Sequence, residues 1–312
     1  TVEVDLPRVA LFHTWRYTQD SGWARYTLEQ QSIPYTLINK DDLRAGGLGK
    51  RFDVIIVPDQ GWLRFKDMVH GIDDKWSPMP YTRTPDFPSH GVIDSSPDIT
   101  GGMGFGGLAN LQGFVTDGGL LVTIAGAGRL VADGGIAREV SSSGAGSTPG
   151  SHVTTKVLRP EHPVTWGYDQ TCWVFHGNDP GFEVSERHQG MVVMQYGTQT
   201  MAEAEDEADR KADIPVETPA TDDEDDEAAP GKSKTPPLCL SGLVKDPSDI
   251  ERKPAILDIP VGKGRVLMYS WNPWHRYQNL HDFAFATNAL LFFNDVPPTP
   301  TEQEMRRRET AD

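Results

Sequence analysis

A glycine-rich turn follows a strongly apolar run at residues 120–128, where the sequence reads LLVTIAGAG. In many hydrolytic enzymes a strand, a tight turn and a helix follow one another in this way, and the turn carries a nucleophilic Ser or Cys. Here the turn consists of Ala125, Gly126, Ala127 and Gly128, and none of these side chains can attack a substrate. The sequence therefore predicts the scaffold of a covalent catalyst that lacks its nucleophile.

Polar residues near the ends of several apolar runs form a second candidate site. Open α/β sheets bind ligands beside the carboxyl ends of their strands, so these residues are expected to line one cleft. We predict that this cleft contains His13, Arg16, Asp59, Gln60, Ala127, Arg129 and His275. The favoured interpretation is a vestigial cleft with no catalytic residue, whose polar groups cap strands and helices. The alternative is a hydrolase with a non-standard arrangement of Asp59, His13 and His275.

An aromatic cluster is expected to consist of Trp271, Trp274 and Tyr277 together with Trp166 and Trp173. Aromatic rings stack on sugars or anchor protein interfaces, and they also fill protein cores. A carbohydrate-binding module that uses this Trp-rich edge is therefore a further alternative. Core packing is expected to account for at least half of the rings.

The sequence predicts no cofactor and no metal site. Cys172 and Cys239 lie outside any Cys-x-x-Cys pattern, which argues against zinc. The two cysteines could form a disulfide in an exported protein or remain free thiols, and both alternatives stay open. The acidic run at residues 222–227 lacks the glycine turn and the ligand spacing of a calcium loop. We expect this run to be solvated rather than calcium-bound.

Alternating strands and helices predict an α/β fold. Apolar runs at residues 8–13, 34–38 and 52–58 are typical of strands buried on both faces, and residues 22–31 have helical spacing. This order predicts a flavodoxin-like, doubly wound and mostly parallel sheet. Later strand-like runs and a hairpin turn at residues 261–264 predict a β-rich C-terminal extension.

We expect a single domain assembled from two halves of the chain. Residues 1–150 form the first half, with an irregular excursion at residues 60–107, and residues 151–296 form a β-rich second half that completes the same domain. An acidic, low-complexity insertion at residues 201–237 separates two strands, 191–196 and 238–244, that we expect to be sheet neighbours. A polar tail occupies residues 297–312. The glycines at residues 101–107 are interpreted as a flexible approach to the next helix rather than as a phosphate cradle.

The charge of the chain limits its partners. The formal net charge of −16 argues against nucleic acid, because phosphate binding needs a basic surface. No apolar run approaches the roughly 20 residues that a membrane-spanning helix needs. The chain begins at Thr1 rather than Met, so we expect a processed product or a piece of a longer protein.

Several segments, taken in order, resemble one known family. They are residues 8–12 (RVALF), 21–29 (SGWARYTLE), 52–59 (FDVIIVPD), 118–123 (GGLLVT) and 262–267 (GKGRVL), followed by Asn272, Arg276 and residues 287–290 (TNAL). Together they resemble the class I glutamine amidotransferase-like domain at the C-terminal end of certain bacterial zinc-carboxypeptidase-like proteins. The resemblance covers most of residues 7–294, apart from the excursion and the acidic insertion.

This resemblance implies a degenerate domain. Active class I amidotransferases combine the turn Cys with a His-x-Glu pair after a later strand, and the matching residues 269–275 (YSWNPWH) lack that pair. No His in the chain is followed three positions later by Glu, so a zinc-peptidase site of the parent protein would lie outside these residues. The resemblance thus implies a non-catalytic accessory or assembly module of an exported, periplasmic or extracellular metallocarboxypeptidase-like protein. The implied partners are the peptidase domain of the same precursor, a partner subunit, a second copy of the chain or a surface polysaccharide.

Overall fold

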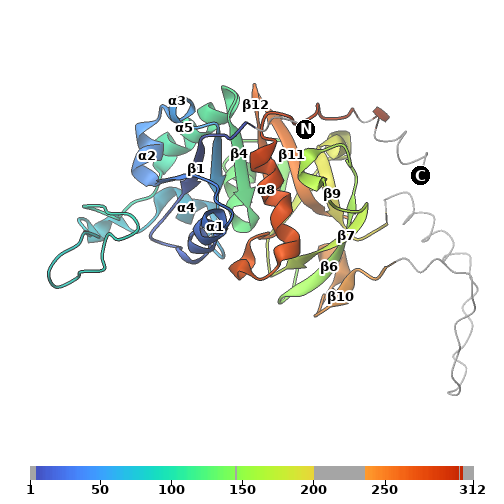
Figure 1. Ribbon diagram of the computed structural model, residues 1–312, viewed down its shortest axis with the longest axis horizontal. Coiled ribbons are helices and arrows are strands. Elements are labelled where there is room, and N and C mark those ends of the chain that lie inside the picture. Colours follow the sequence, from blue (N-terminus) through green and yellow to red (C-terminus); the bar gives the residue numbers. More distant parts are fainter. Residues whose placement is uncertain (1–4, 145, 200–235, 302, 305–312) are drawn as a thin grey trace, which may run out of the picture.

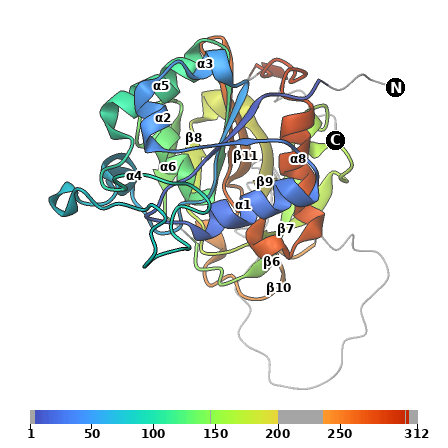
Figure 2. The same ribbon diagram turned by 60° about the vertical axis from the view of Figure 1, so that its left-hand side comes forward.

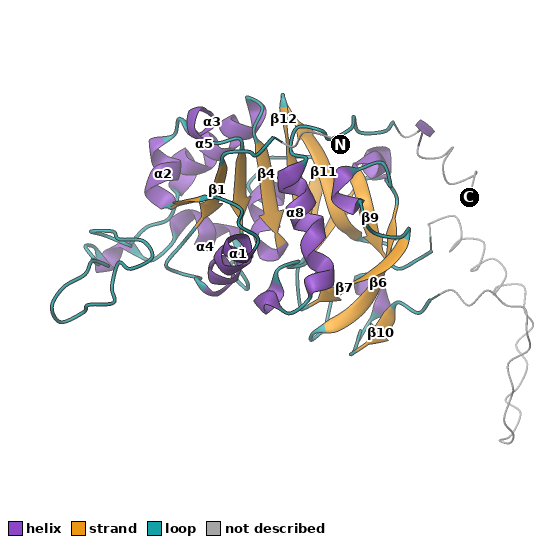
Figure 3. Ribbon diagram, in the orientation of Figure 1, coloured by secondary structure: helices purple, strands orange, loops and turns teal. Residues whose placement is uncertain are grey.

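A computed structural model describes residues 5–144, 146–199, 236–301 and 303–304. Within these residues a ten-stranded mixed sheet runs through the molecule, with helices packed against it (Figures 1 and 3). Five neighbouring strands are parallel, in the order β2-β1-β3-β4-β12. They are β1 (Val9–Phe12), β2 (Thr36–Ile38), β3 (Val54–Val57), β4 (Leu120–Ile124) and β12 (Gly264–Tyr269). This is the flavodoxin-like strand order, so the predicted fold class is confirmed.

An antiparallel extension continues the sheet beyond β12. It consists of β11 (Pro254–Val261), β9 (Val192–Tyr196), β6 (Ser151–Val157) and β10 (Cys239–Ser241), with β7 (Thr171–His176) also paired to β6. A separate two-stranded sheet pairs β5 (Val140–Ser143) with β8 (Gly181–Val184). The predicted pairing of the strands that flank the acidic insertion is wrong, because β6 lies between β9 and β10. The insertion itself and most of the polar tail lie outside the described residues.

Helices cover both faces of the parallel strands (Figure 2). Alternate residues of β1 show this directly: Val9 and Leu11 pack in one core cluster, and Ala10 and Phe12 pack in the other. The first cluster is completed by α1 (Gln19–Gln30) and α8 (Phe283–Leu291). The second is completed by α2 (Lys40–Ala45), α3 (Leu48–Arg51), α4 (Phe65–His70), α5 (Gly104–Thr116) and α6 (Arg129–Ala132).

The excursion at residues 60–107 contains more structure than its composition suggests. It begins with α4 and continues as an irregular arm that projects from the body of the molecule (Figures 1 and 2). Asp98 fixes the base of the arm, because its carboxylate accepts hydrogen bonds from Ser77 Oγ (2.5 Å), the Met79 N–H (3.1 Å) and the Thr100 N–H (2.9 Å). The prediction that residues 101–107 form a flexible approach to the next helix is only partly correct, because α5 begins at Gly104 and includes the last four of these residues.

Both cysteines are free thiols, which settles the alternative that the sequence left open. Cys172 lies on β7 and Cys239 on β10, and both strands pair with β6. Cys172 is buried, with its sulfur 3.1 Å from Thr155 Oγ1. Burial raises the pKa of the Cys172 thiol to about 11, so this thiol is unreactive at neutral pH.

The hairpin turn between β11 and β12 has the predicted geometry, with Val261 opposite Gly264. Gly262 has a φ of 62°, and a Cβ atom there would lie 2.6 Å from the Thr116 carbonyl oxygen. We expect Gly262→Ala to lower the free energy of unfolding by about 1–2 kcal/mol through strain and this contact. Urea titration of both variants measures the effect. Gly22 in α1 has open space around its Cβ position, so the control variant Gly22→Ala should be at least as stable as the wild-type protein.

Candidate functional site

The turn after β4 keeps the backbone of a nucleophile-bearing turn. It forms a single 3₁₀ turn (Ala125–Gly128) between β4 and α6. Ala125 is fully buried and has a φ of 45°, a region that side chains other than Gly rarely occupy. Enzymes with this architecture hold their nucleophile on such a strained turn. The Ala125 methyl group packs in the first core cluster, so this turn presents no nucleophilic side chain.

Ala127, which the sequence placed in the cleft, does not line it. Its side chain is fully buried in the second core cluster, among residues of the helices that cover that face. Ala125 is buried as well, but in the first core cluster, so the two alanine side chains lie on opposite faces of the sheet.

Asp59 occupies the position where an oxyanion would be stabilised. Its Oδ1 atom accepts hydrogen bonds from the Gly61 N–H (2.8 Å) and the Gly126 N–H (2.9 Å). Hydrolases with a nucleophile-bearing turn of this kind bind their oxyanion with the N–H that follows the nucleophile and an N–H from a neighbouring strand loop. Both donors are therefore already used by a side chain of this protein. Arg129 holds the same loop by donating to the Gly61 and Leu63 carbonyl oxygens, each at 3.3 Å.

Two further carboxyl groups lie close enough to Asp59 to affect its charge. Asp20 comes from the start of α1 and accepts a hydrogen bond from Asn272 Nδ2 (2.8 Å). Asp179 comes from the loop between β7 and β8 and accepts from the Gly177 N–H (2.9 Å). None of the three residues is exposed.

The ionisation of these carboxyl groups is suppressed. Burial raises the pKa of Asp59 to about 6, and repulsion from Asp20 adds to the effect. Burial likewise raises the pKa of Asp179 to about 8, with a contribution from the negative charge of Asp59. The pKa of Asp20 is also raised, mainly by burial. Near neutral pH the cluster therefore holds protons that exposed carboxylates would have lost.

His275 belongs to this acidic cluster through Asp20. Burial lowers the pKa of His275, and the negative charge of Asp20 opposes that effect. Its ring stacks on Phe175, with centroids 4.9 Å apart. Asp59, Arg129 and His275 from the predicted cleft are thus brought together around one group of carboxyls.

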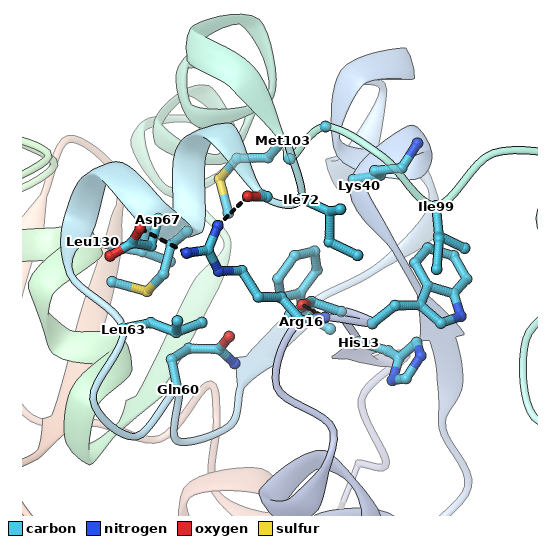
Figure 4. Close-up of a pocket in the computed structure, with 17 residues that line it drawn as sticks. His13, Arg16, Lys40, Gln60, Leu63, Asp67, Ile72, Ile99, Met103 and Leu130 are labelled. Atoms are coloured by element: carbon cyan, nitrogen blue, oxygen red, sulfur yellow. Dashed lines mark hydrogen bonds and ion pairs between the residues drawn. The ribbon is translucent and has the colours of Figure 1, made fainter. Parts of the chain in front are cut away.

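His13, Arg16 and Gln60 line a different cavity (Figure 4). Arg16 donates from Nη2 to Asp67 Oδ1 (2.9 Å) and from Nη1 to the Gly71 carbonyl oxygen. The His13 Nδ1 atom lies 3.3 Å from Ser21 Oγ. Within the described residues, no hydrogen bond or ion pair joins His13 to Asp59 or to His275. The predicted cleft is therefore two sites, and the proposed combination of Asp59, His13 and His275 is not assembled.

The aromatic cluster near the C-terminus belongs to the core. Trp271 and Trp274 are 0% and 1% exposed, and Trp271 Nε1 donates to Asp282 Oδ2 (3.1 Å). Tyr277 is half-buried between Tyr26 and Phe283. The prediction that Trp271 and Trp274 form a binding platform is wrong, because their faces are covered.

The described part of the chain shows neither a metal-binding cluster nor a membrane-spanning helix. No group of three or more His, Cys, Asp or Glu side chains in it is arranged to hold a metal ion. None of its helices combines the length and the apolar character needed to cross a bilayer.

Comparisons with known proteins give structural neighbours only. No family model and no curated protein matches the chain. PurLQS from Thermotoga maritima is 13% identical, with 93% of this chain and 99% of that chain covered and a TM-score of 0.48. A cytoplasmic protein from Salmonella typhimurium is 11% identical, with 92% and 98% covered and a TM-score of 0.44.

A β-galactosidase from Bacillus circulans sp. alkalophilus is 12% identical, with 95% of this chain covered and a TM-score of 0.44. The chain spans about a third of the length of the β-galactosidases that it matches. At these identities the likeness concerns the fold alone. The sheet itself defines the fold, which is an open α/β sheet with a strained turn after β4.

The sequence did not reveal Ala125, Asp20 and Asp179 as members of the site. The composition of the turn could not say which of its four residues takes the positive φ. Asp179 lies in a Gly-Asn-Asp-Pro turn, which is a local loop signal and carries no indication of what the loop approaches. Only the packing of the β7–β8 loop against the ends of the parallel strands brings Asp179 to Asp59.

Proposed function

We propose that this chain is a non-catalytic, amidotransferase-like module that docks other proteins. The observation that carries the proposal is the composition and hydrogen bonding of the turn after β4. Ala125 stands where a nucleophile would be needed, and Asp59 uses both N–H groups that would stabilise an oxyanion. Without a nucleophile the covalent route is closed, and without free donors little electrostatic stabilisation remains.

Exposed apolar side chains on the excursion support a docking role. Trp62, Trp76 and Val92 are 72%, 60% and 71% exposed. Trp76 and Val92 lie on the projecting arm and Trp62 lies just before α4. Exposed apolar patches commonly mark protein interfaces, and long irregular excursions are commonly functional. The partner in this proposal is the peptidase domain of the same precursor or a partner subunit, and a second copy of the chain is the alternative.

The wider context in this proposal is an exported metallocarboxypeptidase-like protein. It rests on the family resemblance of the sequence, and the structure adds no observation to it. The reading frame that encodes the chain tests this context. A secretory signal and a His-x-x-Glu-bearing domain upstream are expected, and an upstream region with neither would remove the peptidase from the proposal.

The absence of catalysis is tested by assaying the full chain against a panel of amide and ester substrates. We expect rates no higher than those of the buffer. The matched variants are Asp59→Ala and His13→Ala, one from each of the two sites. Turnover by the wild-type protein that Asp59→Ala abolishes would overturn the non-catalytic function.

A hydrolase that uses Asp59 and Asp179 is the second candidate. The raised pKa values of these two carboxyls favour it, because general acids and bases work best when they titrate near the operating pH. In that case Asp179→Asn would abolish turnover while leaving the protein folded. If the wild-type protein turns over none of the amide and ester substrates in the panel, this candidate function is excluded.

A further inference from the structure

A cavity lies between the end of β1, helix α1 and the projecting arm. His13 and Trp15 line it just after β1, Arg25 lines it from α1, and Tyr81 and Asp94 line it from the arm. Its volume is about 170 Å³, slightly more than the about 150 Å³ of a cavity that holds benzene. The cavity therefore has room for a ligand of about six or seven non-hydrogen atoms. It is distinct from the site around the β4 turn, since none of the residues of that site lines it.

Two opposite charges line this cavity, and neither has a partner of opposite charge. Within the described residues, the Arg25 side chain makes no hydrogen bond and no ion pair, and its Nε atom is buried. Asp94 Oδ2 accepts a hydrogen bond from Asn39 Nδ2 (2.8 Å), which holds the carboxylate in place but does not neutralise it. Arg25 and Asp94 are both half-buried, and they do not pair with each other.

His13 lies close to both of these charges. Burial lowers the pKa of His13, the negative charge of Asp94 opposes that effect, and the positive charge of Arg25 adds to it. The ring packs edge-on against Trp15, with centroids 5.2 Å apart, and is neutral at neutral pH. Arg25 and Asp94 are therefore the two charged residues among those that line the cavity.

This arrangement of charges favours a ligand that carries both signs. A carboxylate that pairs with Arg25 is repelled by Asp94, and an ammonium group that pairs with Asp94 is repelled by Arg25. A half-buried charge without a partner has lost part of its hydration and has gained nothing in exchange. A molecule with one carboxylate and one ammonium group offsets this loss at both residues.

We propose that this cavity binds a small zwitterion, with its carboxylate at Arg25 and its ammonium group at Asp94. The methylene groups between the two charges contact Ile93 and the rings of Trp15 and Tyr81. The volume of the cavity restricts the ligand to short molecules of the size of β-alanine or 4-aminobutyrate. The site does not depend on the docking role proposed above, because the chain itself supplies every residue that it needs.

Isothermal titration calorimetry of the full chain with glycine, β-alanine and 4-aminobutyrate tests the proposal. These three zwitterions differ in the separation of their charges, so their relative affinities measure the gap that the ligand spans. Butyrate and butylamine each lack one charge of 4-aminobutyrate. We expect saturable binding of at least one zwitterion, and binding at least about tenfold weaker for both singly charged analogues, because each loses a charged hydrogen bond.

Two variants assign the ends of the ligand. In Arg25→Gln the zwitterion should bind no more tightly than butylamine, and in Asp94→Asn it should bind no more tightly than butyrate, because the second charge of the ligand no longer has a partner. The matched controls are Arg51→Gln and Asp133→Asn, which remove the same charges at exposed positions outside the cavity. Both controls should leave binding unchanged.

Gly22→Leu provides a second test that leaves both charges in place. Gly22 lines the cavity and has open space around its Cβ position, so a larger side chain there should fill the cavity without disturbing α1 and should abolish binding. The absence of saturable binding by all three zwitterions would overturn the proposal. Equal affinity for butyrate or butylamine would do the same, as would binding that persists undiminished in Arg25→Gln, Asp94→Asn or Gly22→Leu.

Discussion

Asp258→Ala is expected to lower the free energy of unfolding by about 3–5 kcal/mol, a large part of the stability of a domain of this size. Asp258 is fully buried on β11 and accepts hydrogen bonds from Arg265 Nε (2.7 Å) and Arg159 Nη1 (3.1 Å). The His162 Nε2 atom lies 3.3 Å from the same carboxylate. Removing the carboxylate leaves Arg159, which is also fully buried, without its main counter-charge.

A surface pair of the same chemistry provides the control for this prediction. Asp53 accepts two hydrogen bonds from the Arg8 guanidinium (2.7 Å and 3.0 Å) and one from the Arg8 backbone N–H (2.8 Å), but the two side chains are 52% and 31% exposed. Guanidinium titrations of both variants provide the measurement, and Asp53→Ala should lower the free energy of unfolding by only about 0–1 kcal/mol. Equal losses in the two variants would show that burial is not the decisive difference.

The second large effect concerns the pH dependence of stability. A carboxyl whose pKa is higher in the folded state favours folding when it is protonated. Its contribution is present at low pH and is lost as the pH rises from the unfolded pKa, about 4, through the folded pKa. Because the pKa is raised to about 6 for Asp59 and about 8 for Asp179, stability should fall between pH 4 and pH 8.

Asp179→Asn removes the larger of these two contributions. At pH 8 this variant should be more stable than the wild-type protein by about 2–4 kcal/mol, and near pH 4 the difference should largely disappear. Urea titrations at several pH values provide the measurement, with Asp53→Asn as the surface control. A stability curve that Asp179→Asn leaves unchanged would contradict the view that Asp179 is buried beside another carboxylate.

Much of the fold could be predicted because its signals are local. The hairpin turn at residues 261–264 was predicted, and the observed strand Gly264–Tyr269 begins there, since a glycine-rich turn before an apolar run marks it directly. The parallel order of the first strands follows from the strand–helix alternation and right-handed crossovers. The first helix was found, although it begins at Gln19 rather than Gly22, because Asp20 and Ser21 are buried for reasons of tertiary packing.

The errors concern relations between distant segments. The spacing of residues along the chain could not show that β6 separates β9 from β10. Tryptophan occurs both in protein cores and at binding surfaces, so its presence near the C-terminus did not decide between the two. Trp271 is buried because it packs with residues of α8 in the first core cluster. The sequence alone shows that the turn after β4 contains no Ser or Cys. It could not show that Asp59 accepts from Gly126, since the two residues lie on different loops.

The position of β12 has a consequence for biosynthesis. This strand comes from near the end of the described chain, yet it lies at the centre of the sheet and pairs with β4, where Arg265 is opposite Leu120. During translation, the edge of β4 therefore stays unpaired until most of the polypeptide, including β12, has been synthesised. Nascent chains stalled before Gly264 should remain protease-sensitive and should bind chaperones, whereas chains released beyond α8 should close the sheet.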